Sequence, residues 1–267
     1  MFTHFTLGTN DRPRAEAFYA ATLPPLGLRL VKSVDDFFAY GADQQSPPWL
    51  VISPPYDGLP ATWSNGFHIA LRAGDEAAVR SFHAAALTAG GRDEGAPGLR
   101  PHYAADYYAA YVRDPDGNKL QAVHYRDGRE AGPCGDVISH ITLGSNDLER
   151  SKGFYEGLLG VQGIERLPRE ETPGEDVAFG LAGTRLPIVF VQKPFDGRPA
   201  TWGNGAHVSF DAPSRAAVGA FHEAALSLGG SDEGAPSLRP RYHADYYAAY
   251  VRDPDGNKLQ AYCRKPG

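Results

Sequence analysis

Short stretches of the chain alternate between apolar and polar residues, and segments with helical spacing separate them. The first stretch places Phe5 and Leu7 on one side of an extended chain and His4 on the other, which is typical of a strand with one buried face. A helix that begins after Asn10-Asp11 and ends before Pro24 follows, and then strand-like stretches at residues 31–42 and 49–53. This order predicts one βαβββ module.

The same order of elements is expected four times along the chain. After a strand over residues 66–71, a helix begins at Asp75, and three further strand-like stretches follow. The last two form a hairpin, whose sequence ADYYAAYVRDPDGNKLQA occupies residues 105–122 and, letter for letter, residues 244–261. Its DPDG segment favours a tight turn, because Pro presets one turn position and Gly accepts the left-handed one.

The length of the repeat indicates duplicated domains. His68 and His207 are 139 positions apart, and the early segment HFTLGTND recurs as HITLGSND. Solenoid repeats are much shorter, at roughly 20–50 residues. We therefore predict an α+β chain of two domains, residues 1–125 and 137–267, joined by a polar, Gly-containing linker over residues 126–136.

Composition and charge exclude several classes of partner. The formal net charge is −6 and the sequence contains no run of Lys and Arg, so we expect no nucleic-acid partner. No apolar run reaches the roughly 20 residues of a membrane helix, and the first residues lack the pattern of a signal peptide. Cys134 and Cys263 form no metal or redox spacing. We expect a cytoplasmic protein that does not bind membranes.

The modules and their motifs resemble the vicinal oxygen chelate (VOC) superfamily, which includes glyoxalase I, bleomycin-resistance proteins, extradiol dioxygenases and fosfomycin-resistance enzymes. The motifs are HFTLGTND, NGFHIAL and YVRDPDGNKLQAV in the first domain and HITLGSND, NGAHVSF and YVRDPDGNKLQA in the second. The resemblance spans both domains. It implies that the two modules of each domain curve into an open half-barrel cavity, with the helices outside and a divalent metal ion within.

The resemblance also implies a set of metal ligands in each domain. The ligands of the family on the first, fifth and eighth strands fall on His4, His68 and Gln121 in the first domain and on His140, His207 and Gln260 in the second. The alternation independently points each of these side chains away from its apolar neighbours. The implied cofactor is a divalent metal ion such as Fe, Mn, Ni or Zn. The alternative is that these side chains only form hydrogen bonds inside a polar cavity.

The third ligand is an amide in both domains, where the two-histidine sites of the family have a carboxylate. A Gln oxygen binds a divalent cation without adding negative charge, so we expect a weaker and more electrophilic metal site. Gln also cannot act as a general base. Glyoxalase I uses a ligand carboxylate to move a proton and needs another on its fourth strand, and residues 49–53 and 187–192 contain none. The sequence therefore argues against glyoxalase I itself.

Candidate catalytic residues lie in the duplicated hairpin and in the loop before it. Tyrosine binds flat organic ligands and can donate a proton beside a metal, although it is also common in strands for packing alone. His102 and His243 are unmatched by histidine in the other copy, so the two sites are expected to differ in ligand. The candidates are Tyr107, Tyr111 and His102 in the first domain and Tyr246, Tyr250 and His243 in the second. His83 and His222, on helices, are expected to face solvent.

Two functions are open at this point. One is a metal-dependent enzyme, of dioxygenase or lyase type, that chelates a small oxygenated organic substrate. The other is a metal-free protein of the bleomycin-resistance type that binds a small molecule or drug. The histidine pairs favour the enzyme, which we adopt, and the missing carboxylate favours the binding protein. We expect a pseudo-dimeric monomer, or a higher homo-oligomer of it, because a tandem duplication can supply within one chain the pairing that single-domain relatives reach as dimers.

Overall fold

The computed structural model describes residues 2–44, 47, 49–126, 137–168, 176–184 and 186–266. The expected linker over residues 126–136 lies outside this part of the chain, apart from Arg126. The elements of the first domain are β1 (Phe2–Gly8), α1 (Arg12–Thr22), a 3₁₀ helix η1 (Pro24–Leu26), β2 (Arg29–Val34), β3 (Phe37–Gly41), β4 (Trp49–Ser53), β5 (His68–Arg72), α2 (Glu76–Thr88), β6 (Arg92–Leu99), β7 (Tyr107–Arg113) and β8 (Lys119–Tyr125).

The second domain repeats this order. Its elements are β9 (Ile138–Gly144), α3 (Leu148–Gly160), β10 (Ile164–Arg166), β11 (Asp176–Leu181), β12 (Val189–Gln192), β13 (His207–Asp211), α4 (Arg215–Ser227), β14 (Ser231–Leu238), β15 (Tyr247–Arg252) and β16 (Lys258–Cys263). The predicted α+β class and the four βαβββ modules are confirmed. Among the helices described, none is long and apolar enough to span a membrane.

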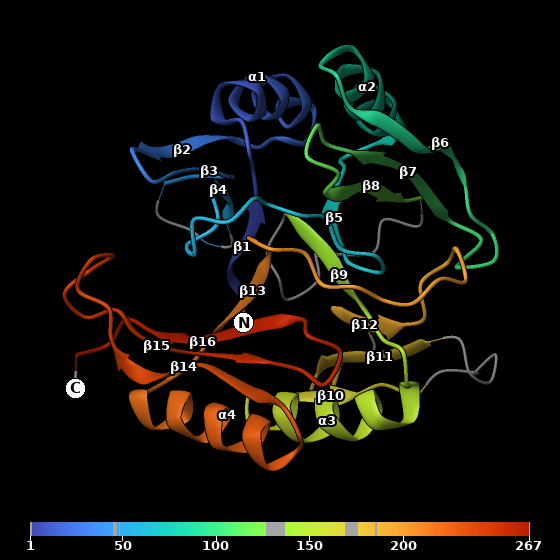
Figure 1. Cartoon of the computed structure of the whole chain (residues 1–267). Helices are drawn as coiled ribbons and strands as arrows, with labels where there is room; N and C mark the ends of the chain where they lie inside the picture. Colours follow the sequence, from blue (N-terminus) through green and yellow to red (C-terminus); the bar gives the residue numbers. More distant parts are fainter. Residues whose placement is uncertain are drawn as a thin grey trace.

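The four modules form two eight-stranded sheets, and each sheet joins one module from each domain. The first sheet has the order β14-β15-β16-β13-β1-β4-β3-β2, and the second has the order β10-β11-β12-β9-β5-β8-β7-β6. The contacts between domains are antiparallel, between β1 and β13 and between β5 and β9. In Figure 1, α1 and α2 lie side by side at one end of the molecule and α3 and α4 at the other, with the strands between them.

This pairing corrects the expectation that the two modules of one domain share a cavity. Each module presents one edge strand, β1, β5, β9 or β13, that can pair with the edge of another module. The sequence of such an edge does not specify which copy it meets, because the four edges are related by duplication. Within each domain the two modules instead pack through their helices, α1 on α2 and α3 on α4.

The duplicated hairpin turn is fastened to the first helix of its domain by a buried hydrogen bond. Helix α1 begins after Asp11, whose side chain accepts from the backbone N–H of Arg14, and it buries Phe18 and Tyr19. The Tyr19 hydroxyl donates to Asp114 over 2.7 Å. In the second domain Tyr155 donates to Asp253 over 2.6 Å. The DPDGN turn therefore helps to hold the hairpin against the first helix in both domains.

Two long connections cross between the sheets and hold each other in place. One leads from β4 to β5 and the other from β12 to β13, so each begins in one sheet and ends at a histidine of the other. Asn65 of the first donates to Asp196 of the second over 3.0 Å, and Asn204 of the second donates to Asp57 of the first over 3.0 Å. The reciprocal bonds fix the start of both histidine-bearing strands.

Candidate functional site

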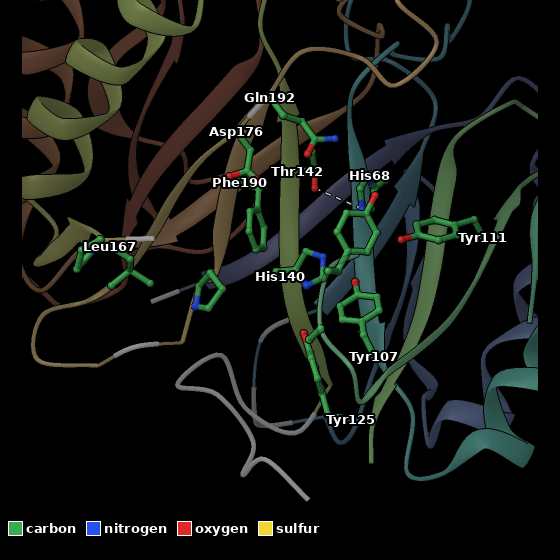
Figure 2. Close-up of a pocket in the computed structure, with 14 residues that line it drawn as sticks. His68, Tyr107, Tyr111, Tyr125, His140, Thr142, Leu167, Asp176, Phe190 and Gln192 are labelled. Carbon is green, nitrogen blue, oxygen red and sulfur yellow. Dashed lines mark hydrogen bonds between the residues drawn. The ribbon is translucent and has the colours of Figure 1, made fainter. Parts of the chain in front are cut away.

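The second sheet contains a cavity of about 470 Å³ that is lined by side chains from both domains. His68 and Gln121 come from β5 and β8, and His140 comes from β9. The His68 Nε2 lies 3.1 Å from Gln121 Oε1, and the His68 and His140 rings are 6.0 Å apart between centroids. Figure 2 shows Phe190 on one side of the cavity and Tyr107 and Tyr111 on the other, with the two histidines between them. We call His68, Gln121 and His140 the second cluster.

The first sheet contains the matching group, His4, His207 and Gln260, which we call the first cluster. Its two histidines come from β1 and β13, and their Nε2 atoms are 3.2 Å apart. Thr6 Oγ1 lies 3.3 Å from His207 Nε2, as Thr142 Oγ1 does from His68 Nε2. The two clusters therefore have the same residue types, with a threonine at the same distance from one histidine, on the two sheets.

The structure redistributes the six predicted ligands between the two sites. We expected His4 to join His68 and Gln121, and His140 to join His207 and Gln260. The pairing of β1 with β13 instead places His4 beside His207, and the pairing of β9 with β5 places His140 beside His68. In each cluster one domain supplies a single histidine and the other supplies a histidine and a glutamine. Each cluster still contains two histidines and one glutamine, which are the residue types that we expected in each metal site.

Neighbouring hydroxyls orient one histidine of each cluster. Thr3 Oγ1 donates to Ser209 Oγ over 2.7 Å, which uses its only proton, so it accepts from His4 Nδ1–H at 3.1 Å. His4 then presents an unprotonated Nε2 to the cluster. In the second cluster Ser139 Oγ holds the same place, 3.0 Å from His140 Nδ1. Such a contact to the outer ring nitrogen is typical of metal-binding histidines.

Burial keeps three of the cluster imidazoles, those of His4, His68 and His207, uncharged at neutral pH. It lowers the pKa of His4 to about 4, and it holds the pKa of His207 and of His68 well below the usual value. The partner histidine lowers the pKa further, through His4 in the case of His207 and through His140 in the case of His68. A neutral imidazole binds a cation through the ring nitrogen that carries its lone pair, which in His4 is Nε2.

Comparison with known proteins shows which superfamily has this architecture. The pattern of the Glyoxalase/Bleomycin resistance protein/Dioxygenase superfamily matches residues 2–122 and 137–261. The chain belongs to this superfamily. It is similar in fold to glyoxalase I from Zea mays, at 21% sequence identity and a TM-score of 0.74 over 98% of this chain and 92% of that chain.

A glyoxalase/bleomycin resistance protein from Albidiferax ferrireducens T118 is 36% identical over 46% of this chain and 98% of that chain, with a TM-score of 0.42. No curated protein matches the chain. The likeness to the maize enzyme shows the fold alone. The resemblance that the motifs indicated is thus confirmed at the level of the superfamily.

The donor set of the first cluster fits a divalent cation of the kind that this superfamily commonly uses. Two ligand nitrogens about 2.1 Å from one ion, at 90–109°, lie roughly 3.0–3.4 Å apart, which brackets the His4–His207 separation. Gln260 Oε1 is buried, and the Gln260 side chain interacts with His207 without a hydrogen bond of good geometry to this oxygen among the described residues. No group of three or more His, Cys, Asp and Glu side chains is gathered for a metal among the described residues, so the amide oxygen would be the third protein ligand.

The candidate tyrosines lie next to the glutamines. Gln121 Nε2 donates to the Tyr107 hydroxyl over 2.5 Å, and Gln260 Nε2 donates to Tyr246 and Tyr250 over 2.8 and 2.9 Å. Tyr111 lines the cavity of the second sheet directly opposite Gln121 on the paired strand. Burial raises the pKa of all four phenols, so each keeps its proton at neutral pH.

The structure does not bring the two candidate loop histidines to the clusters. His102 is exposed and packs on Tyr103, with ring centroids 4.1 Å apart, and His243 Nδ1 accepts from the backbone N–H of Asp245. The expectation that His83 and His222 face solvent is wrong. Both are buried and lie 2.8 Å from Asp93 and Asp232, because each helix packs its histidine against the neighbouring strand.

Several cavity residues were missed from the sequence. Thr142 lies two positions after His140 in β9, so the period of two could have placed it on the same face. Phe190 and Gln192 come from the other module of the sheet, and only the pairing of the domains brings them to His68. Phe190 lies 5.0 Å from His140 between ring centroids and gives that side of the site an apolar wall.

Proposed function

We propose that the protein is a divalent-metal-dependent enzyme, of the dioxygenase or lyase type, that acts on a small oxygenated organic molecule in the cavity of the second sheet. The observation that carries the proposal is the twofold convergence of two histidines and one buried glutamine, with the Nε2 atoms of His4 and His207 3.2 Å apart in the first cluster. In the second sheet the same group adjoins a cavity of about 470 Å³, a size suited to a small molecule.

The residues of the second cluster have separate roles in this proposal. His68, His140 and Gln121 would hold the ion, which supplies Lewis-acid stabilisation of negative charge on a chelated oxygen. Tyr111 keeps its proton and donates a hydrogen bond to that oxygen as charge develops, and Tyr107, which also keeps its proton, lies beside it in the cavity wall. Phe190 and the tyrosines exclude water and hold a flat substrate between them (Figure 2). No carboxylate is needed for these steps.

A metal-free binding protein is the second candidate, and one observation favours it. Gln121 already has hydrogen-bond partners at both ends, His68 at its oxygen and Tyr107 at its nitrogen. A closed set of hydrogen bonds satisfies these buried groups without an ion. The cavity would then bind an organic molecule through its aromatic walls alone.

Metal analysis separates the two candidates. The full chain, purified without an affinity tag, is stripped with a chelator, reloaded in turn with Fe(II), Mn(II), Ni(II) and Zn(II), and analysed for bound metal. The proposal predicts up to two ions per chain and the loss of one ion in His68→Ala. His102→Ala is the matched control, because His102 is exposed and outside the clusters. Absence of metal under every condition would leave the binding protein as the function.

We further propose that one chain is a complete pseudo-dimer, formed by domains at residues 1–125 and 137–267. Support comes from the two sheets, each of which already contains a module from both domains. Light scattering should give the mass of a single chain, 28.8 kDa. A mass of twice that value would contradict this part of the proposal.

A further inference from the structure

The glutamine of each cluster has a defined hydrogen-bond polarity. An amide nitrogen can only donate and an amide oxygen can only accept. In the second cluster the oxygen of Gln121 faces His68 Nε2 at 3.1 Å, and its nitrogen faces the Tyr107 hydroxyl. Tyr107 must therefore accept from Gln121, and its own proton has to go elsewhere.

That proton is directed along the sheet toward the cavity. Tyr107 and Tyr111 both line the cavity, and their phenols interact, which raises the pKa of Tyr107 and opposes the effect of burial on Tyr111. Because Tyr107 accepts from Gln121, we infer that the donors run in one direction, from Gln121 through Tyr107 to Tyr111. The hydroxyl proton of Tyr111, which lines the cavity, is the one that this chain of donors leaves for a ligand.

The first cluster repeats the device with a different branching. Gln260 Nε2 donates to both Tyr246 and Tyr250, so one amide group uses both of its protons on phenols. Both phenols accept from the glutamine, and the Gln260 side chain also interacts with His207. A carboxylate at position 260 or 121 could not do this, because it would accept from the phenols.

The charges beside Tyr111 favour an anion at its hydroxyl. Lys119 Nζ lies 5.2 Å from the centre of the Tyr111 ring, and the guanidinium of Arg100 also acts on the Tyr111 phenol. Lys119 is paired with Glu94 at 3.4 Å, which reduces its field without removing it. The cavity also contains Asp176, which lies on the side of Phe190 and Gln192, away from Tyr111 (Figure 2).

We propose that Gln121 is a positioning residue that makes the tyrosine wall a hydrogen-bond donor, and that the cavity of the second sheet binds a flat organic ligand through an anionic oxygen placed at Tyr111. This deepens the proposed function, because it names the class of ligand, and it gives the amide a role that a carboxylate cannot perform. It does not require the metal, since each contact in the chain of donors is made by protein atoms.

The test measures binding of two probes to chelator-treated full-length protein by calorimetry. Naphthalene-2-sulfonate is a permanently anionic flat molecule, and naphthalene-2-sulfonamide is its neutral counterpart. The wild-type protein should bind the sulfonate about tenfold more tightly than the sulfonamide, since hydrogen bonds to an anion are the stronger ones. Tyr111→Phe and Gln121→Met should lose this preference, and Gln121→Glu should reverse it.

Gln260→Met is the matched control, because it removes the same amide from the first cluster and should leave the preference of the cavity for the sulfonate unchanged.

Zn(II) titration of the same variants separates this role of Gln121 from metal binding. Affinity for zinc should decrease in the order Glu, Gln, Met at position 121, whereas the preference for the sulfonate should be greatest with Gln. A preference for sulfonate that survives in Gln121→Met or Tyr111→Phe would overturn the proposal, as would failure of the wild type to bind either probe. Loss of zinc binding with the anion preference intact would count only against the metal-dependent function.

Discussion

The Nε2 atoms of His4 and His207 lie 3.2 Å apart, although 203 positions separate the two residues in the chain. Each histidine belongs to a different copy of the duplicated domain, and His68 and His140, also from different copies, lie with ring centroids 6.0 Å apart on the other sheet. Neither copy therefore contains a complete cluster. Each sheet combines one module from each copy, so the chain builds two composite clusters from four related modules.

Gly66 should tolerate no side chain, because it allows the β4–β5 connection to contact the end of β9. Its φ is +98°, and a Cβ there would lie 2.6 Å from the Cα of Gly144. We expect Gly66→Ala to lower the free energy of unfolding by at least about 1–3 kcal/mol, measured by denaturant titration. Gly153 in α3 is the control, since a Cβ there meets no atom within 4 Å and Gly153→Ala should raise stability by about 0.5–1 kcal/mol. Equal stability of the two variants would contradict the close backbone contact.

The metal-free protein should lose stability as pH falls from about 6.5 toward about 4. Burial lowers the pKa of His4 from 6.5 to about 4 and that of His207 in the same direction. In this window the unfolded chain binds more protons than the folded one, so the free energy of unfolding decreases as pH decreases. His4 alone accounts for about 3 kcal/mol over the whole window. Urea titrations between pH 7 and 5 measure the slope, and the variant His4→Asn/His207→Asn should show a shallower one.

Removing the Tyr19 hydroxyl should destabilise the first domain through the buried carboxyl of Asp114. Asp114 is 2% exposed, and it accepts from Tyr19 at 2.7 Å and from Asn118 at 2.8 Å. Tyr19→Phe leaves this acceptor with one donor fewer, which should cost about 1–3 kcal/mol in thermal or denaturant unfolding. Tyr103→Phe, at a side chain that is 46% exposed, should change stability little. A loss as small as that of the control would mean that the turn does not depend on this bond.

Much of the fold followed from the sequence because its signals are local. Alternation identified the strands, the DPDG segment identified the hairpin, and the repeat of HFTLGTND as HITLGSND gave the duplication. These features depend on residues close together in the chain. The types of residue that gather in each cluster also followed, because the period of two fixes which face of a strand a side chain occupies.

The grouping of those residues did not follow, for a physical reason. Pairing between β1 and β13 is a long-range choice among four related edges, and the local pattern of each edge is the same. For that reason Phe190 and His140 could not be placed beside His68 from the sequence. His83 was misjudged on similar grounds, because its partner Asp93 is held near it only by the packing of α2 on β6.

The most direct test of the composite sites is the number of bound ions in paired histidine variants, determined by native mass spectrometry with Zn(II). The wild type should hold two ions per chain. His4→Ala/His207→Ala removes both histidines of one cluster and should leave one ion, whereas His4→Ala/His68→Ala damages both clusters and should leave none. Retention of one ion by His4→Ala/His68→Ala, with none in His4→Ala/His207→Ala, would contradict the exchange of modules and place each site within a single domain.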